Sequence, residues 1–367
     1  MQDAIPLEIA DLEIEASGPT ELEPGLWRIP SPVPFGARLV NLYLLRGPSA
    51  DDWLLVDCPL NTSRSEAALT SALAQIGIAP SAISAIVLTH THPDHLGAAG
   101  FWQQRTGARI YLLAPAAHDI LPLWTDLDNK AFIEAAHALV THGMPADEAQ
   151  ALVTRAVQIR AVLVPPTHPT LLAHHQHVRL AGASYRVFWL PGHADGQLGL
   201  LRDDGLLLAG DTVFATMQPT VGWYPWSRSD PMADQLATLT ALRSIPARLT
   251  LPGHGAPVAN LDERANQLTG AYTRELVTVS RLLAESAPAG LTAYTLANTL
   301  YSLRMRLPDS RLLAMSEAVA RLEHLRNIGR AERVTGDDGM LTYVRSDESA
   351  SERQPDSEQT DIQDAAS

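Results

Sequence analysis

Cysteine is almost absent from this chain of 367 residues, since Cys58 is the only one. A single thiol excludes an intrachain disulfide framework. Residues 1–18 also lack the basic and then apolar pattern of a secretory leader, and no apolar run approaches the roughly 18 residues of a membrane span. We therefore predict a cytoplasmic protein that does not bind membranes.

Lysine is equally scarce, because Lys130 is the only one. The formal net charge of −14 is carried by the chain ends: residues 1–23 contribute −7 and residues 346–367 contribute −6, so the remainder is close to neutral. Proteins that bind nucleic acids usually concentrate positive charge on one face, and no such stripe is visible. The charge pattern therefore argues against a nucleic-acid partner.

Against these absences stand residues 89–95, which read THTHPDH. Four of these side chains can bind a metal: His90, His92, Asp94 and His95. A core does not favour so many imidazoles and carboxylates side by side, because each would need a separate hydrogen bond once desolvated. The preceding residues 84–89 are apolar and β-rich, and Pro93 stops the strand. The pattern predicts a metal site on a loop at a strand end.

The same arrangement recurs three times downstream, where a short apolar strand is followed at once by a glycine turn and one polar side chain. These side chains are His193, Asp211 and His254. Imidazole and carboxylate ligands without a thiolate suit zinc, although iron or manganese would accept the same set.

The order HxHxDH, His, Asp, His resembles the metallo-β-lactamase fold superfamily, over about residues 25–260. The resemblance implies an α/β (α+β) fold, the αββα sandwich, in which two mixed sheets face each other between outer helices. It implies one metal site formed by His90, His92 and His193. A second site would be formed by Asp94, His95 and His254, with Asp211 bridging the two.

The implied chemistry is hydrolysis by two divalent metal ions, most simply Zn²⁺. Three protein ligands on each ion leave open positions, which marks a catalytic site. Water held between the ions would lose a proton near neutral pH, about 8 to 9 units below the pKa of bulk water, and become the nucleophile. Asp94 and Asp211 would be the catalytic carboxylates, as metal ligands. Asp57, at the end of an apolar run, would brace the ligands; an ordinary turn residue is the alternative.

Two segments beyond these ligands are candidates for shaping the substrate site. The helical insert at residues 115–180 holds helix patterns over 131–140 and 145–159, and such inserts in the family lie over the active-site mouth. Trp223, Tyr224 and Trp226 follow Asp211 and either line a substrate pocket or anchor a long loop. The remaining histidines are not expected to bind metal: His118, His137, His142, His168, His174, His175, His177 and His324.

The C-terminal segment reads as three helices, over 262–284, 291–301 and 311–327, followed by a hairpin over 330–335 and 340–345. This order resembles the winged-helix appendage of one branch of the superfamily, which includes Lactb2-like endoribonucleases. Eleven arginines against ten acidic residues in 262–345 favour dimerisation or a border to the active site over nucleic-acid binding. We thus expect an acidic, disordered or extended end at 1–24, a catalytic domain at 25–260, a winged-helix domain at 261–345 and a disordered acidic tail at 346–367.

The leading functional hypothesis is a hydrolase of a small ester, thioester or lactone, as in the glyoxalase II-like members. Two alternatives stay open. The same metals would cut phosphodiesters in a Lactb2-like endoribonuclease, and a mononuclear iron persulfide dioxygenase would use the equivalents of His90, His92 and His193.

Overall fold

The computed structural model describes residues 18–34, 38–49, 52–125 and 127–346. Most of the two acidic ends, residues 1–17 and 347–367, therefore lies outside the described residues. By its internal contacts the chain divides into two compact units. The first unit comprises residues up to 128 with 155–219 and 242–264, and the second comprises 129–154, 220–241 and the residues from 265 onward.

The first sheet lies in the first unit and holds seven strands among the described residues. In spatial order these are β1 (Thr20–Glu23), β2 (Leu26–Pro32), β3 (Leu39–Arg46), β4 (Trp53–Val56), β5 (Ile83–Val87), β6 (Arg109–Leu113) and β7 (Thr170–Leu172). Pairing is antiparallel from β1 to β4 and parallel from β4 to β7. The parallel part brings the carboxyl ends of β4 and β5 to one edge.

The second sheet also lies in the first unit. Its order is β12 (Leu249–Pro252), β11 (Leu206–Gly210), β10 (Leu198–Arg202), β9 (Ala183–Trp189) and β8 (His177–Leu180). All neighbours pair antiparallel except β11 and β12, which run parallel. The carboxyl ends of β9, β11 and β12 consequently lie at the same edge of this sheet.

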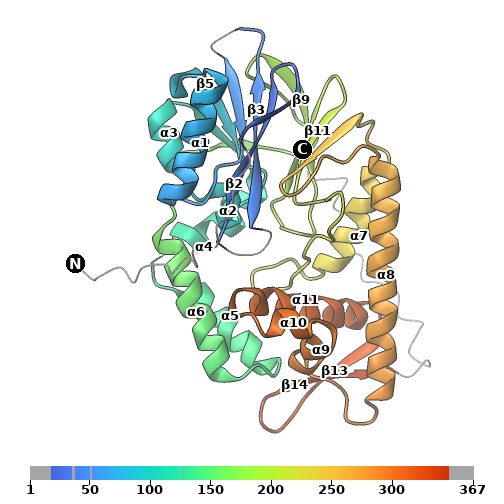
Figure 1. Ribbon diagram of the computed structural model, residues 1–367. Coiled ribbons are helices and arrows are strands. Elements are labelled where there is room, and N and C mark those ends of the chain that lie inside the picture. Colours follow the sequence, from blue (N-terminus) through green and yellow to red (C-terminus); the bar gives the residue numbers. More distant parts are fainter. Residues whose placement is uncertain (1–17, 35–37, 50–51, 126, 347–367) are drawn as a thin grey trace. The chain divides into compact units, whose positions relative to one another are not determined.

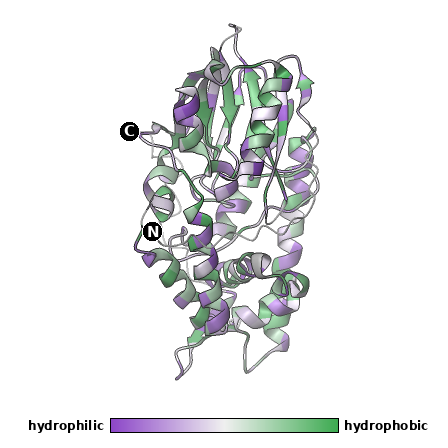
Figure 2. Ribbon diagram, turned by 60° about the vertical axis from the view of Figure 1, so that its left-hand side comes forward, coloured by the Kyte–Doolittle hydropathy of each residue, from purple (hydrophilic) through white to green (hydrophobic). Residues whose placement is uncertain are grey.

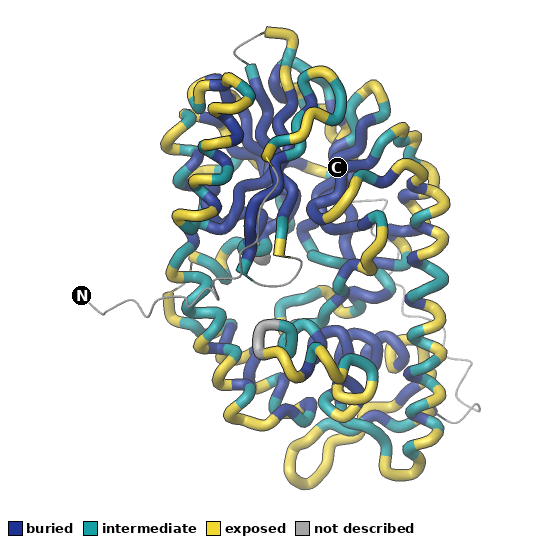
Figure 3. The backbone as a smooth tube through the Cα atoms, in the orientation of Figure 1, coloured by how far each residue is buried: buried dark blue, intermediate teal, exposed yellow. Residues whose placement is uncertain are grey.

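The hydrophobic core of the first unit has two layers, because successive residues of a strand point to opposite faces. Leu54 of β4 packs between the sheets with residues such as Val187 and Leu208 of the second sheet. Its neighbour Leu55 packs on the outer face, with Trp102. Figure 2 shows the strands as mainly hydrophobic, and Figure 3 shows them buried along most of their length. Each such leucine contributes about 1.5 to 3 kcal/mol by its burial.

Helices α1 (Ser63–Ile76) and α3 (Ala99–Thr106) cover the outer face of the first sheet (Figure 1). The hydroxyl of Thr62 begins α1 by accepting a hydrogen bond from the Ser65 amide, and Gly77 ends it in the left-handed conformation at φ 81°. Two sheets face to face, with helices outside, confirm the predicted sandwich. Short segments complete the connections: η1 (Pro80–Ala82), α2 (Pro93–Leu96), η2 (Ala116–Ile120) and α4 (Leu121–Thr125).

The second unit is mainly helical. It contains α5 (Lys130–Thr141), the first half of α6 (Ala146–Ala161), α7 (Pro231–Leu242), most of α8 (Leu261–Glu285), α9 (Ala293–Leu300), α10 (Ser302–Met305), α11 (Pro308–Asn327) and the hairpin of β13 (Ala331–Thr335) and β14 (Leu341–Arg345). The C-terminal helices and the hairpin lie where the sequence predicts them. None of the described helices has the length and hydrophobicity needed to cross a membrane.

The helical insert does not stay within the first unit. Residues 129–154 group with the C-terminal helices because they pack against them. The Tyr294 amide donates to the carbonyl of His142, and the carboxylate of Glu148 lies 3.1 Å from Arg311. The division between the compact units therefore crosses the chain within α6 as well as at 264/265, close to the boundary expected at residue 260.

Candidate metal centre

The predicted ligands follow strand ends of the first unit. His90 and His92 follow β5, His193 follows β9, Asp211 follows β11 and His254 follows β12. Pro93 begins the single-turn helix α2, because its fixed φ suits the first helical position. That turn carries the two remaining ligands, Asp94 and His95. All seven side chains belong to one compact unit.

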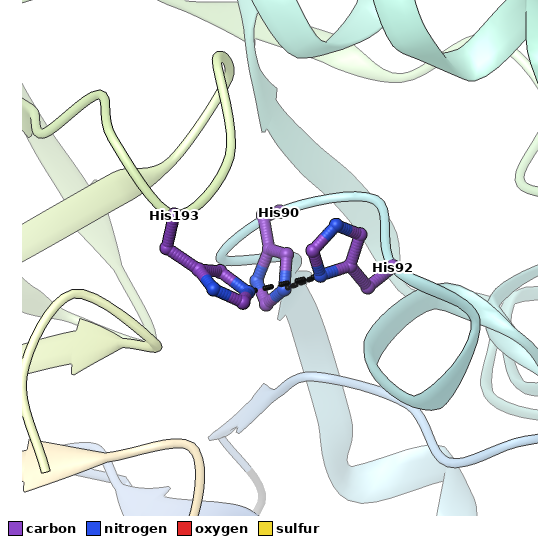
Figure 4. A group of neighbouring side chains, drawn as sticks. All are labelled: His90, His92 and His193. Carbon is purple, nitrogen blue, oxygen red and sulfur yellow. Dashed lines mark hydrogen bonds between the residues drawn. The ribbon is translucent and has the colours of Figure 1, made fainter. Parts of the chain in front are cut away.

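The first group is formed by His90, His92 and His193, whose rings point toward one another from two loops (Figure 4). Nδ1 of His92 lies 3.0 Å from Nε2 of His90 and 2.9 Å from Nε2 of His193. A single ring nitrogen has one proton or one lone pair, so it cannot satisfy both neighbours. Three converging imidazole nitrogens fit a shared cation better than a hydrogen-bond network.

The second group is formed by Asp94, His95 and His254. Nε2 of His254 lies 3.4 Å from Oδ2 of Asp94, and Nε2 of His95 lies 3.8 Å from the same oxygen. These separations exceed those of ordinary N–H···O hydrogen bonds. The atoms face a common point without pairing closely.

Asp211 lies between the two groups. Its Oδ1 is 3.5 Å from Nε2 of His95, and its Oδ2 is 3.5 Å from Nε2 of His193 and 3.3 Å from Nε2 of His254. Both Oδ1 of Asp211 and Nε2 of His95 are buried with no hydrogen-bond partner among the described residues. Buried polar atoms of this kind normally have a partner, and a cation between them would supply it.

The outer nitrogens of three rings are held by hydrogen bonds that fix which nitrogen faces inward. Asp57 accepts from the Thr89 amide at 2.7 Å and hydroxyl at 2.9 Å, and its Oδ2 lies 2.8 Å from Nδ1 of His95. The Thr89 hydroxyl then accepts from Nδ1 of His90 at 3.1 Å. Nδ1 of His254 donates to the carbonyl of Leu39 at 2.6 Å. In each ring Nε2 therefore faces the centre, as metal ligands require.

The charges of the site favour a bound cation. Burial lowers the pKa of His90 and of His92, the latter to about 3, so both rings are neutral, which is the form that binds metal. Burial also lowers the pKa of His254, but the nearby carboxylates outweigh it and raise that pKa to about 10. For Asp94, burial alone would raise the pKa, but the adjacent histidines outweigh burial and lower the pKa to about 2. The second group therefore attracts positive charge, either protons or a metal ion.

Two residues not singled out from the sequence support the ligand segments. The buried Nε2 of Gln197 lies 3.4 Å from the carbonyl of Thr89, which precedes His90, and 3.4 Å from that of Ala209, which precedes the last residue of β11. Nε1 of Trp124 donates to the carbonyl of Thr91 at 2.7 Å. In the sequence, Gln197 is noticeable only as a glutamine that follows a glycine shortly after His193. Its partner Thr89 lies 108 positions away, so the sequence does not indicate the contact.

The aromatic residues expected near a pocket lie in the second unit. Tyr224 stacks on Trp226 with ring centroids 5.1 Å apart, and Trp223 meets the ring of His142 at 5.8 Å. Their role in binding substrate stays a prediction. None of the candidate metal groups in the described part of the chain includes the histidines of the insert or His324. His142 is buried against Tyr343 and is not a surface residue.

Comparison with known proteins identifies the family. The model of the metallo-beta-lactamase superfamily matches residues 35–254. The chain belongs to this superfamily. It is accordingly a metal-dependent hydrolase, and its family accounts for a histidine and aspartate cluster at the strand ends.

Three proteins resemble this chain over most of its length. A metallo-beta-lactamase family protein from Thermus thermophilus is 33% identical, with a TM-score of 0.77 over 89% of this chain and 100% of that one. A beta-lactamase domain protein from Burkholderia ambifaria shares the fold, with a TM-score of 0.78 at 23% identity over 92% of this chain and 97% of its own. The probable metallo-hydrolase YqjP of Bacillus subtilis is 24% identical over 305 residues, which are 80% of this chain and 90% of the relative.

Gly253 is expected to be essential to this metallo-hydrolase centre. A Cβ at this position would lie 2.1 Å from Oδ1 of Asp211 and 2.7 Å from Cε1 of His95. Gly253→Ala must therefore displace two ligands. We expect the variant to bind Zn²⁺ about 10- to 100-fold more weakly, the range found when the supports of ligands are altered, as measured by chelator-competition titration.

Gly107→Ala is the control for backbone strain in the same unit. No described atom lies within 4 Å of a Cβ there, its φ of +73° makes alanine cost roughly 1 to 2 kcal/mol in backbone strain, and it follows α3, away from the predicted ligands. We expect it to bind Zn²⁺ as the wild type does, and equal zinc affinity of the two variants would contradict the displacement of ligands at Gly253.

Proposed function

We propose that the protein is a dinuclear zinc hydrolase that cleaves a small ester, thioester or lactone. The position of Asp211 carries this proposal. Its Oδ2 lies 3.5 Å from Nε2 of His193 in the first group and 3.3 Å from Nε2 of His254 in the second, and its Oδ1 lies 3.5 Å from Nε2 of His95. A carboxylate that lies beside both groups suits a pair of ions better than a single one, because its two oxygens can be shared between the ions.

The donor set fits two divalent ions. One ion would be held by His90, His92 and His193. The other would be held by Asp94, His95 and His254, and Asp211 would be shared. When bound, such ions make a water acidic enough to deprotonate near neutral pH and polarise the oxygen of the scissile carbonyl.

The residues around the ligands prepare the centre before any substrate arrives. Asp57 fixes the ring of His95, and the Leu39 carbonyl fixes that of His254. Rings held in one tautomer bind metal without a cost of reorientation. The Trp124 indole holds the Thr91 carbonyl, and thus the loop between His90 and His92. The chain therefore contributes orientation and charge, and water supplies the attacking group.

A mononuclear iron dioxygenase of persulfides is less well supported. That activity would use His90, His92 and His193, and it leaves Asp94, His95 and His254 without a metal to bind. Nε2 of His95 and Oδ1 of Asp211 would then stay buried 3.5 Å apart with no hydrogen bond among the described residues, which costs roughly 1 to 3 kcal/mol for each atom. The second group is thus better explained by a second ion.

The order of elements in the second unit supports a winged-helix module, whereas its charges do not support a nucleic-acid-binding surface. Helices α8, α9 and α11 and the hairpin of β13 and β14 follow the order of that module. Two arginines of the C-terminal helices are paired. Arg304 of α10 pairs with Glu317, and Arg311 of α11 lies 3.1 Å from Glu148. Paired guanidinium groups are neutralised in place, and they release few counterions from a phosphate backbone. A role in dimerisation or substrate selection is therefore proposed over an endoribonuclease role.

Metal analysis joined to substrate profiling tests the proposal. We expect close to two zinc ions per chain, and hydrolysis of at least one of S-acyl glutathione, acyl-CoA or a lactone. A chelator should abolish this activity and added Zn²⁺ should restore it. One iron per chain with oxygen uptake on a persulfide, or cleavage of single-stranded RNA alone, would instead support one of the two alternatives.

A further inference from the structure

Strand β3 carries two buried polar residues within an apolar sequence, LVNLYLLR. Asn41 is 5% exposed and Tyr43 is 2% exposed, and they point to the same face because they are two positions apart. A buried amide is costly unless its hydrogen-bonding atoms are satisfied. Their partners therefore show what these residues do.

Those partners all lie in the loop that carries His254. The side-chain amide of Asn41 donates to the carbonyls of Pro252 at 3.1 Å and Gly255 at 2.8 Å. The Tyr43 hydroxyl donates to the Pro252 carbonyl at 2.8 Å, and the Asn41 main-chain amide donates to the Gly253 carbonyl at 2.7 Å. Four hydrogen bonds from two residues thus reach both sides of one metal ligand.

These bonds cross from one sheet to the other. Strand β3 belongs to the first sheet, whereas the loop follows β12 of the second. The same strand also orients the ligand ring, because the Leu39 carbonyl accepts from Nδ1 of His254. Both the backbone and the ring of His254 are therefore set by β3.

We propose that Asn41 and Tyr43 are positioning residues that hold the His254 loop in place and thereby set the affinity of the second metal position. The inference rests on the proposed function, in which Asp94, His95 and His254 hold an ion. The first group has no ligand in this loop, so its affinity should depend little on β3.

Two conservative variants separate this role from general stability. Tyr43→Phe removes a single hydroxyl, and Asn41→Asp replaces the donating amide with an oxygen that faces two carbonyls. Tyr185→Phe is the matched control, because Tyr185 is equally buried and its hydroxyl bonds to Arg202 and not to a ligand loop. The full-length proteins are titrated with Zn²⁺ against a chelator, and with Co²⁺ while the visible spectrum is recorded.

We expect Tyr43→Phe and Asn41→Asp to weaken binding of the second ion by about 10- to 100-fold and to leave the first within about twofold. The Co²⁺ spectrum of the second position should change with them. Tyr185→Phe should change neither affinity, even where its thermal unfolding temperature falls as far as that of Tyr43→Phe.

Two results would overturn the inference. One is equal affinity of the second ion in Tyr43→Phe, Asn41→Asp and Tyr185→Phe, and the other is equal weakening of both ions. In either case a wild-type protein with two ions and hydrolytic activity would leave the proposed function standing. A wild-type protein that binds only one ion would instead overturn both.

Discussion

Replacing Asp211 with asparagine is expected to lower kcat/KM for hydrolysis by on the order of 10³-fold, which corresponds to about 4 kcal/mol. The amide keeps the shape of the side chain but removes its negative charge and one of its acceptor oxygens. Oδ2 lies 3.3 Å from His254 and 3.5 Å from His193, and Oδ1 lies beside His95. An ion held by these histidines would then be bound by a weaker ligand at position 211. The loss should be accompanied by lower metal content in both positions, measured in the same preparation.

Asp204→Asn provides the matched control for this substitution. Asp204 lies in the same unit but precedes β11, at the opposite end of that strand from Asp211. Its side chain is 45% exposed and pairs with Arg202 and Arg248, neither of which is a predicted ligand. We expect its activity and metal content to equal those of the wild type. Asp211→Asn that kept two ions and activity within about tenfold would contradict the shared-ligand role.

The places of the candidate metal ligands at strand ends were predictable because each one follows a local pattern. A buried strand, a turn residue and one polar side chain recur at His193, Asp211 and His254, and strand ends are read from a few neighbouring residues. The family resemblance supplied the arrangement of the sheets. Helices α5 and α6 were predictable for the same reason, since their apolar residues repeat with the period of a helix.

The supports of the ligands were not predictable, because their partners lie far away in the sequence. Asn41 and Pro252 are 211 positions apart, and Gln197 and Thr89 are 108 apart. Only the packing of two sheets brings such residues together, and no local pattern encodes it. A polar residue inside an apolar strand indicates that a partner exists, but not which one.

The grouping of residues 129–154 with the C-terminal helices escaped prediction for a similar reason. The sequence shows helical patterns in the insert but not the surface against which they pack. The contact of Glu148 with Arg311 joins two segments of the second unit that are distant in the sequence, and it is fixed by tertiary packing. Helix propensity is local, whereas the choice of partner is not.

Replacing Arg321 with methionine is expected to lower the free energy of unfolding of the second unit by about 3 to 5 kcal/mol. Arg321 lies in α11, is 1% exposed, and places its guanidinium 3.1 Å from Glu275 and 3.6 Å from Glu317. It also donates to the Val221 carbonyl at 2.7 Å. Removing this cation takes away one of the two guanidinium partners of the buried Glu317, whose other partner is Arg304, and also the guanidinium beside Glu275.

Hydrogen exchange of α11 peptides and urea denaturation of the full chain measure the effect. Arg281→Met is the control, because Arg281 pairs with Glu285 on an exposed face of α8 and should contribute only about 0.3 to 0.5 kcal/mol. Adding Glu275→Gln and Glu317→Gln to Arg321→Met should recover part of the lost stability, since the two negative charges beside the missing cation are gone. A loss of less than about 1 kcal/mol, or no recovery in the triple variant, would show that hydrophobic packing and not the ion pairs stabilises this part of the second unit.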